Sequence, residues 1–271
     1  MRINSVLLIL FIITIACEFP SQPEAAEEDT LVPEADPRQT AVLYVQQAAE
    51  YEALCHQGYQ VAYDRMMLAL QEDSFANPAV ILDLDETVLD NSPYAAWQVS
   101  HNRPYDPESW QRWVALAQAE AVPGAASFLK AADCKGLRIF YLTNRQETGR
   151  DATLANLKKL GLPQADSSQL LMRTGTSHKA ARRKMIRDKG YRIVLYIGDN
   201  LGDFKQLWDG QSTAERSDRV KEYRRALGRR FIILPNPVYG EWLEAVYKHR
   251  DDLRESAKDS IRRVILEEAA F

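Results

Sequence analysis

Five short apolar runs are the most regular feature of the hydrophobic pattern. Each run is rich in Ile, Val, Leu or Tyr, shows no alternation of polar and apolar positions, and is followed by polar residues. The runs are residues 79–82, 137–142, 169–172, 193–197 and 231–234. Strands that are buried on both faces have this pattern, so we expect a parallel sheet with both faces covered.

Amphipathic patterns of helical period separate these runs. They lie at residues 125–133, 148–160, 179–189 and 216–227. Strands that alternate with helices are typical of βαβ units. The pattern therefore predicts an α/β fold, a doubly wound, Rossmann-like parallel sheet within a domain of residues 38–271.

Additions to this core are predicted at three places. Residues 38–75 show apolar spacing typical of two N-terminal helices, with a break near Gly58. Residues 91–136 predict a small, mostly helical, cap-like insertion between the first two strands. Over the last 30 residues, apolar positions from Trp242 to Val264 fall on one stripe, which predicts a single closing helix laid on the domain.

The first 37 residues have a different composition. Arg2 precedes an apolar stretch at residues 6–16, which is short for a membrane span of roughly 20 residues but typical of a signal peptide. Ala16 and Cys17 resemble the end of a bacterial lipoprotein signal, so we expect residues 1–17 to be that signal and Cys17 to be lipidated. An ordinary cleaved signal and an uncleaved anchor are the alternatives. Residues 18–37 hold four prolines and seven acidic residues, which predicts a flexible tether.

Composition narrows the class of protein. The 271 residues are 46% hydrophobic and 27% charged, which is typical of a soluble domain with a real core. A net charge of −4 argues against a partner that is a nucleic-acid polymer, but it is compatible with a small phosphorylated substrate. If Cys17 bears lipid, Cys55 and Cys134 either form one disulfide in an oxidising envelope or remain free buried thiols.

Polar side chains cluster where the predicted parallel strands end. In an open α/β sheet, ligands bind at the carboxyl ends of the strands. The polar residues placed there, or on the helix before the fourth strand, are Asp83, Asp85, Thr143, Asn144, Lys179, Asp199 and Asp203. Any one of the acids could serve only as a turn former or helix cap, but the whole set is hard to explain in that way. Acids at the ends of two strands in one crevice repel one another unless a cation lies between them, and oxygen ligands suit Mg²⁺.

The sequence resembles a known family at these positions. Asp83, Asp85 and Thr87 match the Asp-x-Asp-x-Thr/Val motif of the haloacid dehalogenase (HAD) superfamily of phosphohydrolases. The wider sequence resembles the class C non-specific acid phosphatases, which are exported lipoproteins of nucleotidase type. The matching segments, in order, are ILDLDETVLDN at 81–91, AVPGA at 121–125, FYLTNR at 140–145, HKAAR at 178–182, IGDNLGDF at 197–204 and LPNPVYGEW at 234–242.

The resemblance implies different catalytic roles for Asp83 and Asp85. Asp83 is expected to attack phosphorus and form an aspartyl phosphate, and Asp85 to protonate the leaving group and then deprotonate water. Asp83, Asp199 and the backbone carbonyl of Asp85 are the expected Mg²⁺ ligands, while Asp203 is expected to orient bound water or Lys179.

The same resemblance assigns the phosphate contacts. Thr143 and the backbone of Asn144 are expected to hold phosphoryl oxygens. Lys179 is expected to neutralise the negative charge, as cations do in phosphoryl transfer. Its neighbours with the same charge are Arg182, Arg183 and Lys184, and position in the first turn of the helix favours Lys179.

Aromatic side chains are the expected determinants of substrate choice. By the resemblance, Trp110 of the insertion and Tyr239 clamp a substrate ring, with Trp97 as the substitute; simple core packing is the alternative for most of these rings. The predicted enzyme is a Mg²⁺-dependent acid phosphatase acting on nucleoside monophosphates and other phosphate monoesters. It is expected to be lipid-anchored in the bacterial envelope, at the outer membrane. The sequence leaves open whether it forms a homo-oligomer. A phosphotransferase, or a lipoprotein that binds an aromatic ligand such as haem, is the alternative function.

Overall fold

The computed structural model describes residues 36–71, 76–250 and 252–269. The predicted signal peptide with Cys17, and all but the last two residues of the predicted tether, lie outside the described residues. None of the described helices is long and apolar enough to span a bilayer.

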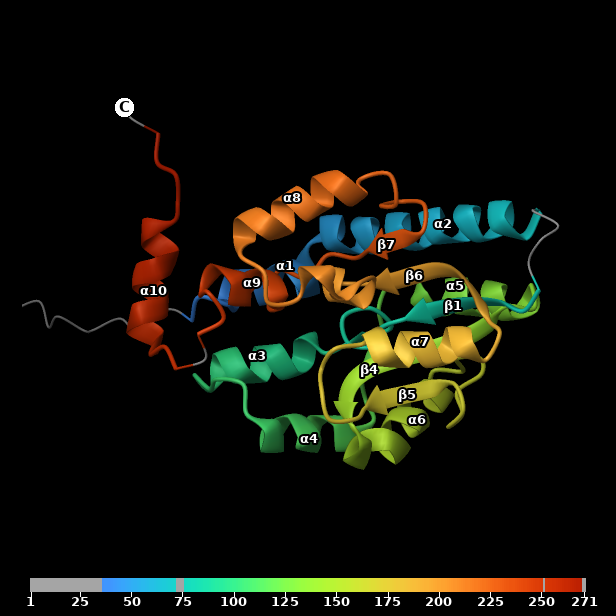
Figure 1. The fold of residues 1–271 in the computed structure, drawn as a ribbon. Coiled ribbons are helices and arrows are strands. Elements are labelled where there is room, and N and C mark those ends of the chain that lie inside the picture. Colours follow the sequence, from blue (N-terminus) through green and yellow to red (C-terminus); the bar gives the residue numbers. More distant parts are fainter. Residues whose placement is uncertain (1–35, 72–75, 251, 270–271) are drawn as a thin grey trace, which may run out of the picture. The chain divides into compact units, whose positions relative to one another are not determined.

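A five-stranded parallel sheet forms the centre of the described chain (Figure 1). Its strands are β1 (Pro78–Leu82), β4 (Arg138–Gln146), β5 (Leu170–Arg173), β6 (Arg192–Gly198) and β7 (Phe231–Ile233). The spatial order is β5-β4-β1-β6-β7, and all neighbouring pairs are parallel. The predicted α/β fold is therefore confirmed. Because the chain winds in opposite directions from β1, the carboxyl end of β1 faces the crevice in which such sheets bind ligands.

Both faces of the sheet are covered, and the alternation of side chains in β1 shows how. Val80 and Leu82 pack in a core with α2 (Ala49–Gln71), α5 (Ala125–Cys134) and α6 (Arg150–Lys159). Ala79 and Ile81 pack on the other face with α7 (Ala180–Asp188) and with side chains from the segment after β6. This burial on both faces accounts for the unbroken apolar runs in the sequence.

The N-terminal helices break at a different place from the one predicted. α1 (Gln39–Gln47) ends at Ala48, whose backbone is extended, and Gly58 lies within the continuous helix α2. A β-carbon on Gly58 would lie 2.6 Å from Cδ2 of Leu234. The prediction of a break at Gly58 was wrong because this glycine permits close packing of α2 against the chain after β7 rather than ending a helix.

Two helices stand between the strands of a small antiparallel ladder. β2 (Leu89–Asp90) pairs with β3 (Glu120–Ala121), and α3 (Ser92–Ser100) and α4 (Pro107–Leu116) lie between them. α5 follows β3 and buries Phe128 and Leu129 in the main core. The part of the insertion outside the main core is thus mostly α3 and α4.

The C-terminal region forms two helices instead of one. Three-residue 3₁₀ turns, η2 (Leu201–Asp203) and η3 (Gln206–Trp208), follow β6 and precede α8 (Thr213–Tyr223); a third, η1 (Glu147–Gly149), precedes α6. After β7 come α9 (Glu241–Val246) and α10 (Glu255–Val264). The predicted single helix was wrong, because Lys248 and His249 have positive φ angles and end the helical path. α10 buries no residue.

The two cysteines of the domain are free thiols. Cys55 is buried in α2 and Cys134 is exposed at the end of α5. Burial raises the pKa of the Cys55 thiol to about 11. The disulfide alternative was therefore wrong. The other alternative, two free buried thiols, is right for Cys55 but not for Cys134, which is exposed.

Candidate active site

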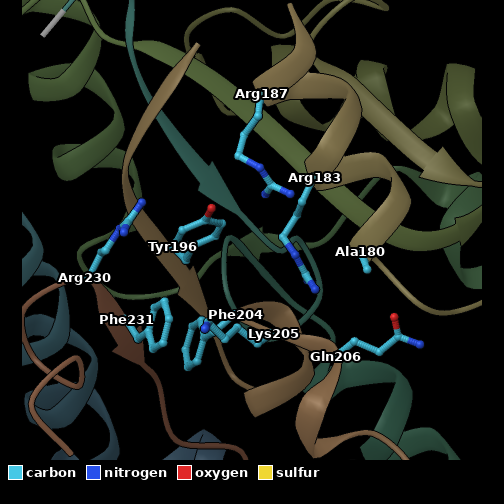
Figure 2. Close-up of a pocket in the computed structure, with 9 residues that line it drawn as sticks. All are labelled: Ala180, Arg183, Arg187, Tyr196, Phe204, Lys205, Gln206, Arg230 and Phe231. Atoms are coloured by element: carbon cyan, nitrogen blue, oxygen red, sulfur yellow. The ribbon is translucent and has the colours of Figure 1, made fainter. Parts of the chain in front are cut away.

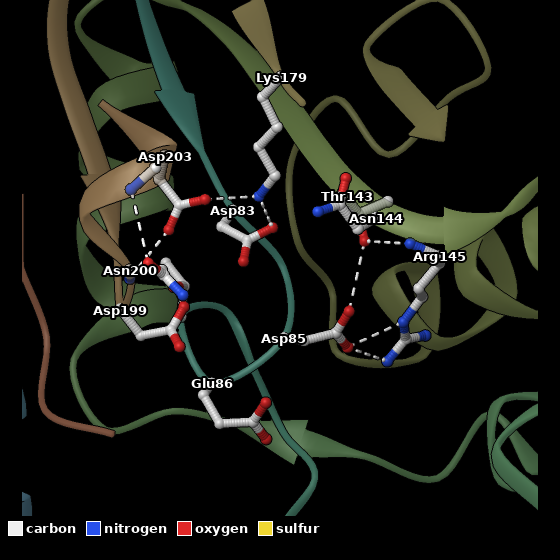
Figure 3. A network of polar contacts seen from close by, with 12 residues as sticks. Asp83, Asp85, Glu86, Thr143, Asn144, Arg145, Lys179, Asp199, Asn200 and Asp203 are labelled. Carbon is white, nitrogen blue, oxygen red and sulfur yellow. Dashed lines mark hydrogen bonds and ion pairs between the residues drawn. The ribbon is translucent and has the colours of Figure 1, made fainter. Parts of the chain in front are cut away.

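A tight loop after β1 directs two acids toward the crevice. The backbone N–H of Asp83 donates to the carbonyl of Ile197 at 3.0 Å, which continues the parallel ladder by one residue. Beyond it, the carbonyl of Leu84 accepts from three successive N–H groups, those of Thr87, Val88 and Leu89. Glu86 has a φ of 56° and turns the chain back. This loop holds Asp83 and Asp85 at the carboxyl edge of the sheet (Figure 3).

Asp83 lies against the ammonium group of Lys179. Nζ of Lys179 is 2.5 Å from Oδ1 of Asp83 and 2.7 Å from Oδ1 of Asp203 (Figure 3). Burial alone would lower the pKa of Lys179, but the charges of Asp203 and Asp83 outweigh it and raise that pKa. Lys179 is thus held as a cation at the first acid of the motif.

The three neighbouring cations on the same helix are engaged elsewhere. Arg182 donates to the carbonyl of Thr143 and to Oδ1 of Asn144. Arg183 donates to backbone carbonyls after β6, and Lys184 pairs with Asp188 at 2.7 Å. Within the described ion pairs, Lys179 is the cation that reaches Asp83, as the sequence analysis expected.

Three carboxylates converge beside Lys179. Oxygens of Asp83, Asp199 and Asp203 lie within 4.8 Å of one another. Asp199 also accepts from the hydroxyl of Thr87 at 3.3 Å and from the amide of Asn236 at 2.8 Å. Burial, with the nearby charge of Asp203, raises the pKa of Asp199 to about 7. Burial likewise raises the pKa of Asp83, although Lys179 opposes that shift.

The charge balance of this cluster is suited to a divalent cation. Three carboxylates face one ammonium group, and all the converging ligand atoms are oxygens. Oxygen-only sites of this kind suit Mg²⁺ or a similarly hard metal ion. Asp203 belongs to the same cluster and also holds Lys179 at 2.7 Å, so its expected orienting role is compatible with its position.

Asp85 is held by a different set of partners. Its Oδ1 accepts from Arg145, with Nη2 at 2.8 Å, and from the amide of Asn91 at 3.0 Å. Its Oδ2 accepts from the hydroxyl of Thr143 at 3.3 Å. Arg145 is only 2% exposed, and it also donates to Thr153 and to Oδ1 of Asn91.

Known proteins identify the family of this site. The chain matches the profile of the HAD superfamily, subfamily IIIB (acid phosphatase), over residues 15–242. Its structure superposes on the class C acid phosphatase from Bacillus anthracis with a TM-score of 0.82 and 39% identity, covering 86% of this chain and 98% of that one. The chain belongs to the subfamily IIIB acid phosphatases. The predicted family and the predicted class of enzyme, a phosphoric monoester hydrolase, are confirmed.

Two curated proteins are also similar to part of this chain. Acid phosphatase 1 of Solanum lycopersicum is 30% identical over 59% of this chain and 57% of its own length. The stem 31 kDa glycoprotein of Glycine max is 27% identical over 63% of each chain. The chain therefore spans less than two thirds of the length of these curated relatives.

The two phosphate-binding candidates differ in accessibility. Thr143 is fully buried, and its hydroxyl bonds Asp85 and accepts from the N–H of Arg145 at 3.0 Å. Asn144 is exposed, and Arg182 holds its side chain. The side chain of Asn144 is therefore accessible, whereas the hydroxyl of Thr143 is already engaged by Asp85.

Two of the three aromatic candidates contact neighbours of Asp85. The half-buried Trp110 places its ring 5.6 Å from the guanidinium carbon of Arg145. Tyr239 is 44% exposed, and its hydroxyl donates to Oε2 of Glu86. Trp97, the substitute candidate, packs on Tyr94 and His101.

Sequence reasoning missed the residues that hold Asp85. Arg145 and Asn91 both contact its carboxylate, and Trp113 donates to Oδ1 of Asn91 at 2.8 Å. The available signal was Arg145 itself, a charged residue at the end of a strand predicted to be buried. Asn236, which donates to Asp199, was also missed.

Proposed function

We propose that this protein is a Mg²⁺-dependent phosphomonoesterase that passes the phosphoryl group first to Asp83 and then to water. The observation that supports the proposal most directly is the separation of the two acids of one motif. Asp83 lies against Lys179 in the carboxylate cluster, while Asp85 is held apart by Arg145, Asn91 and Thr143.

The chemistry follows from these positions. An oxygen of Asp83 attacks phosphorus, and the bond from phosphorus to the leaving oxygen breaks. Asp85 gives its proton to that oxygen. Asp85 then takes a proton from water, whose oxygen attacks the phosphorus of the aspartyl phosphate, and the products are inorganic phosphate and free Asp83. Lys179 neutralises charge on Asp83 and on the transferred group throughout.

The residues present fit a divalent metal ion. Asp83, Asp199 and the backbone carbonyl of Asp85 are the proposed ligands, and the surplus of carboxylates over ammonium groups supports them. Bound there, Mg²⁺ would supply positive charge to the phosphoryl oxygens. A second structure of the Bacillus anthracis enzyme, 38% identical with a TM-score of 0.83, has tungstate bound. Tungstate is an oxyanion, as phosphate is, so its binding by a relative supports a phosphoryl site in this chain.

The proposed substrates are nucleoside monophosphates and aryl phosphates. Trp110 adjoins Arg145, which holds Asp85, and Tyr239 contacts Glu86, which follows Asp85 in the chain, so a leaving group at Asp85 would lie near both rings. An aromatic ring stacks on any π-face, which suits a broad choice of ringed substrates.

The proposed location is the bacterial cell envelope, with lipid on Cys17 as the anchor to the outer membrane. A Cys17→Ser variant should leave the membrane fraction and take up no labelled palmitate. Palmitate uptake by neither wild type nor variant would contradict the anchor while leaving the enzyme assignment intact.

The activity is tested by phosphate release from a panel of monoesters. We expect turnover with Mg²⁺, loss of at least about 100-fold after exhaustive EDTA treatment, and recovery when Mg²⁺ is restored. Mg²⁺ should also raise the melting temperature, because a ligand that binds only the native state stabilises it. Full activity after EDTA treatment would contradict the metal dependence.

A further inference from the structure

Four cations surround a pocket that shares no residue with the catalytic cluster. Arg183 and Arg187 of α7, Lys205 after η2, and Arg230 before β7 border a cavity of about 360 Å³ (Figure 2). No carboxylate is among the residues that line it. A protein with a net charge of −4 therefore has a local site that is strongly positive.

Three of these four cations donate hydrogen bonds to groups other than carboxylates. Arg183 donates from Nη1 to the carbonyls of Gly202 and Asp203, both at 2.9 Å. Lys205 donates to the hydroxyl of Tyr223 at 3.3 Å, and Arg230 to a backbone carbonyl at 3.3 Å. Within the described residues, none of the four forms an ion pair with a carboxylate.

Another cation of α7, Lys184, does form an ion pair with a carboxylate. Lys184, one residue from Arg183, pairs with Asp188 at 2.7 Å on the exposed side of the helix. Arg183 is instead 3% exposed. Burial lowers the pKa of Arg183, and the charge of Arg187 acts in the same direction although Asp203 and Asp209 oppose it. Two guanidinium groups that repel each other beside a cavity would both be stabilised by an anion between them.

The rest of the lining favours a small molecule over a bare ion. Tyr196, Phe204 and Phe231 form an apolar wall between the cations (Figure 2). The volume is within the range of about 300–1,000 Å³ that is common for small-molecule sites. Guanidinium groups match phosphate oxygens by paired hydrogen bonds. We propose that this pocket binds a small polyanion that bears two or more phosphate-type groups.

Arg183 connects the pocket to the catalytic segment. The carbonyls that it holds belong to Gly202 and Asp203, and the carboxylate of Asp203 lies 2.7 Å from Lys179. Arg183 thus supports the segment that bears Asp203, and Asp203 contacts Lys179. An anion that contacts Arg183 therefore acts on the position of this segment. Binding in the pocket and binding at the catalytic site are consequently coupled, and such coupling is reciprocal.

The binding claim is tested by calorimetric titration of the full chain with methylenediphosphonate, a non-hydrolysable diphosphate analogue, in excess Mg²⁺. The double variant Arg187→Gln/Arg230→Gln removes two cations of the pocket. Arg229→Gln is the matched control, since Arg229 is an exposed neighbour of Arg230 that does not line the pocket. We expect a loss of at least about tenfold in affinity in the double variant and none in the control.

Two results would overturn the binding claim. Equal affinity in all three proteins would place the binding elsewhere, at the catalytic site. Equal losses in the double variant and in Arg229→Gln would mean general attraction by surface charge.

The coupling is tested by turnover of p-nitrophenyl phosphate in the same preparations. Without the probe, all three proteins should turn over within about twofold of each other, because surface substitutions have small effects. With the probe, kcat at saturating substrate should change in wild type and not in the double variant. A change in KM alone, equal in both, would overturn the coupling. Failure of all three proteins to turn over substrate would instead contradict the proposed function, and the titration would still decide on the pocket.

Discussion

Asp83 and Asp85, the two acids of one motif, differ in how far the chain itself supplies positive charge and hydrogen-bond donors to their carboxylates. Asp83 lies among like charges, and one ammonium group faces three carboxylates there. Asp85, two residues on, has a buried guanidinium group and two hydrogen-bond donors of its own. The surroundings of Asp85 are complete within the chain, whereas those of Asp83 call for a further cation. A loop of a few residues thus gives two identical side chains different chemistry.

Replacing Asp83 should have the largest effect on activity. Asp83→Asn keeps the shape of the side chain but removes the attacking oxygen anion, so we expect a loss of at least about a thousandfold in kcat. The measurement is steady-state phosphate release from p-nitrophenyl phosphate, with the melting temperature as the control for folding. Activity within about tenfold of wild type, or roughly 1.4 kcal/mol of barrier, would contradict the nucleophile assignment.

Asp85, the second acid of the motif, is tested through Arg145, the residue that positions it. Arg145→Gln should reduce kcat/KM for substrates with poor leaving groups, such as alkyl phosphates, by about 100-fold, because their phosphoryl transfer to Asp83 depends on protonation by Asp85. 2,4-Dinitrophenyl phosphate needs little protonation, so its kcat/KM, which does not include the later hydrolysis of the aspartyl phosphate, should fall by less than about tenfold. The two rates come from one preparation, so their ratio does not depend on how much of the variant is folded.

Arg145→Lys serves as the matched variant, since it keeps the charge but not the forked donors. We expect it to recover part of the rate on alkyl phosphates. An equal loss in kcat/KM on both substrates in Arg145→Gln would show that Arg145 supports the fold and not the position of Asp85.

The sheet and its acids were predictable for a physical reason. Strands buried on both faces are unbroken apolar runs, and parallel strands end at one edge, so the hydrophobic pattern alone places Asp83, Asp85, Asp199 and Asp203 at the same edge of the sheet. Lys179 could be chosen over its neighbours from its place in the first turn of the helix.

The errors at Gly58 and at Asp85 concern contacts that depend on tertiary packing. Gly58 was predicted to end a helix, but it packs against Leu234, which no local pattern shows. The partners of Asp85 were missed because Asn91 and Arg145 reach it from a helix start and a neighbouring strand. Local spacing shows where a side chain begins, but the partner that holds it depends on tertiary packing.

The smallest expected effects concern the aromatic side chains of Trp110 and Tyr239. Trp110→Ala and Tyr239→Ala should each reduce kcat/KM for nucleotides and aryl phosphates by about 5- to 150-fold, the effect of losing one stacking face. A small alkyl phosphate should change little, since the catalytic groups contact the other end of the substrate. Equal losses on ringed and ringless substrates would show that these rings pack the core, and Trp97→Ala would then be the next variant to measure.

The central claim, that Asp83 is the nucleophile and Asp85 the acid and base, is tested most directly in an Asp85→Asn variant mixed rapidly with 2,4-dinitrophenyl phosphate. Its good leaving group departs without Asp85, but hydrolysis of the aspartyl phosphate lacks its base. We predict fast release of about one equivalent of dinitrophenolate, then a slow phase, with the phosphoryl group found on the peptide containing Asp83 after acid quenching. Steady turnover with no fast phase and no phosphoryl group on that peptide would contradict the account.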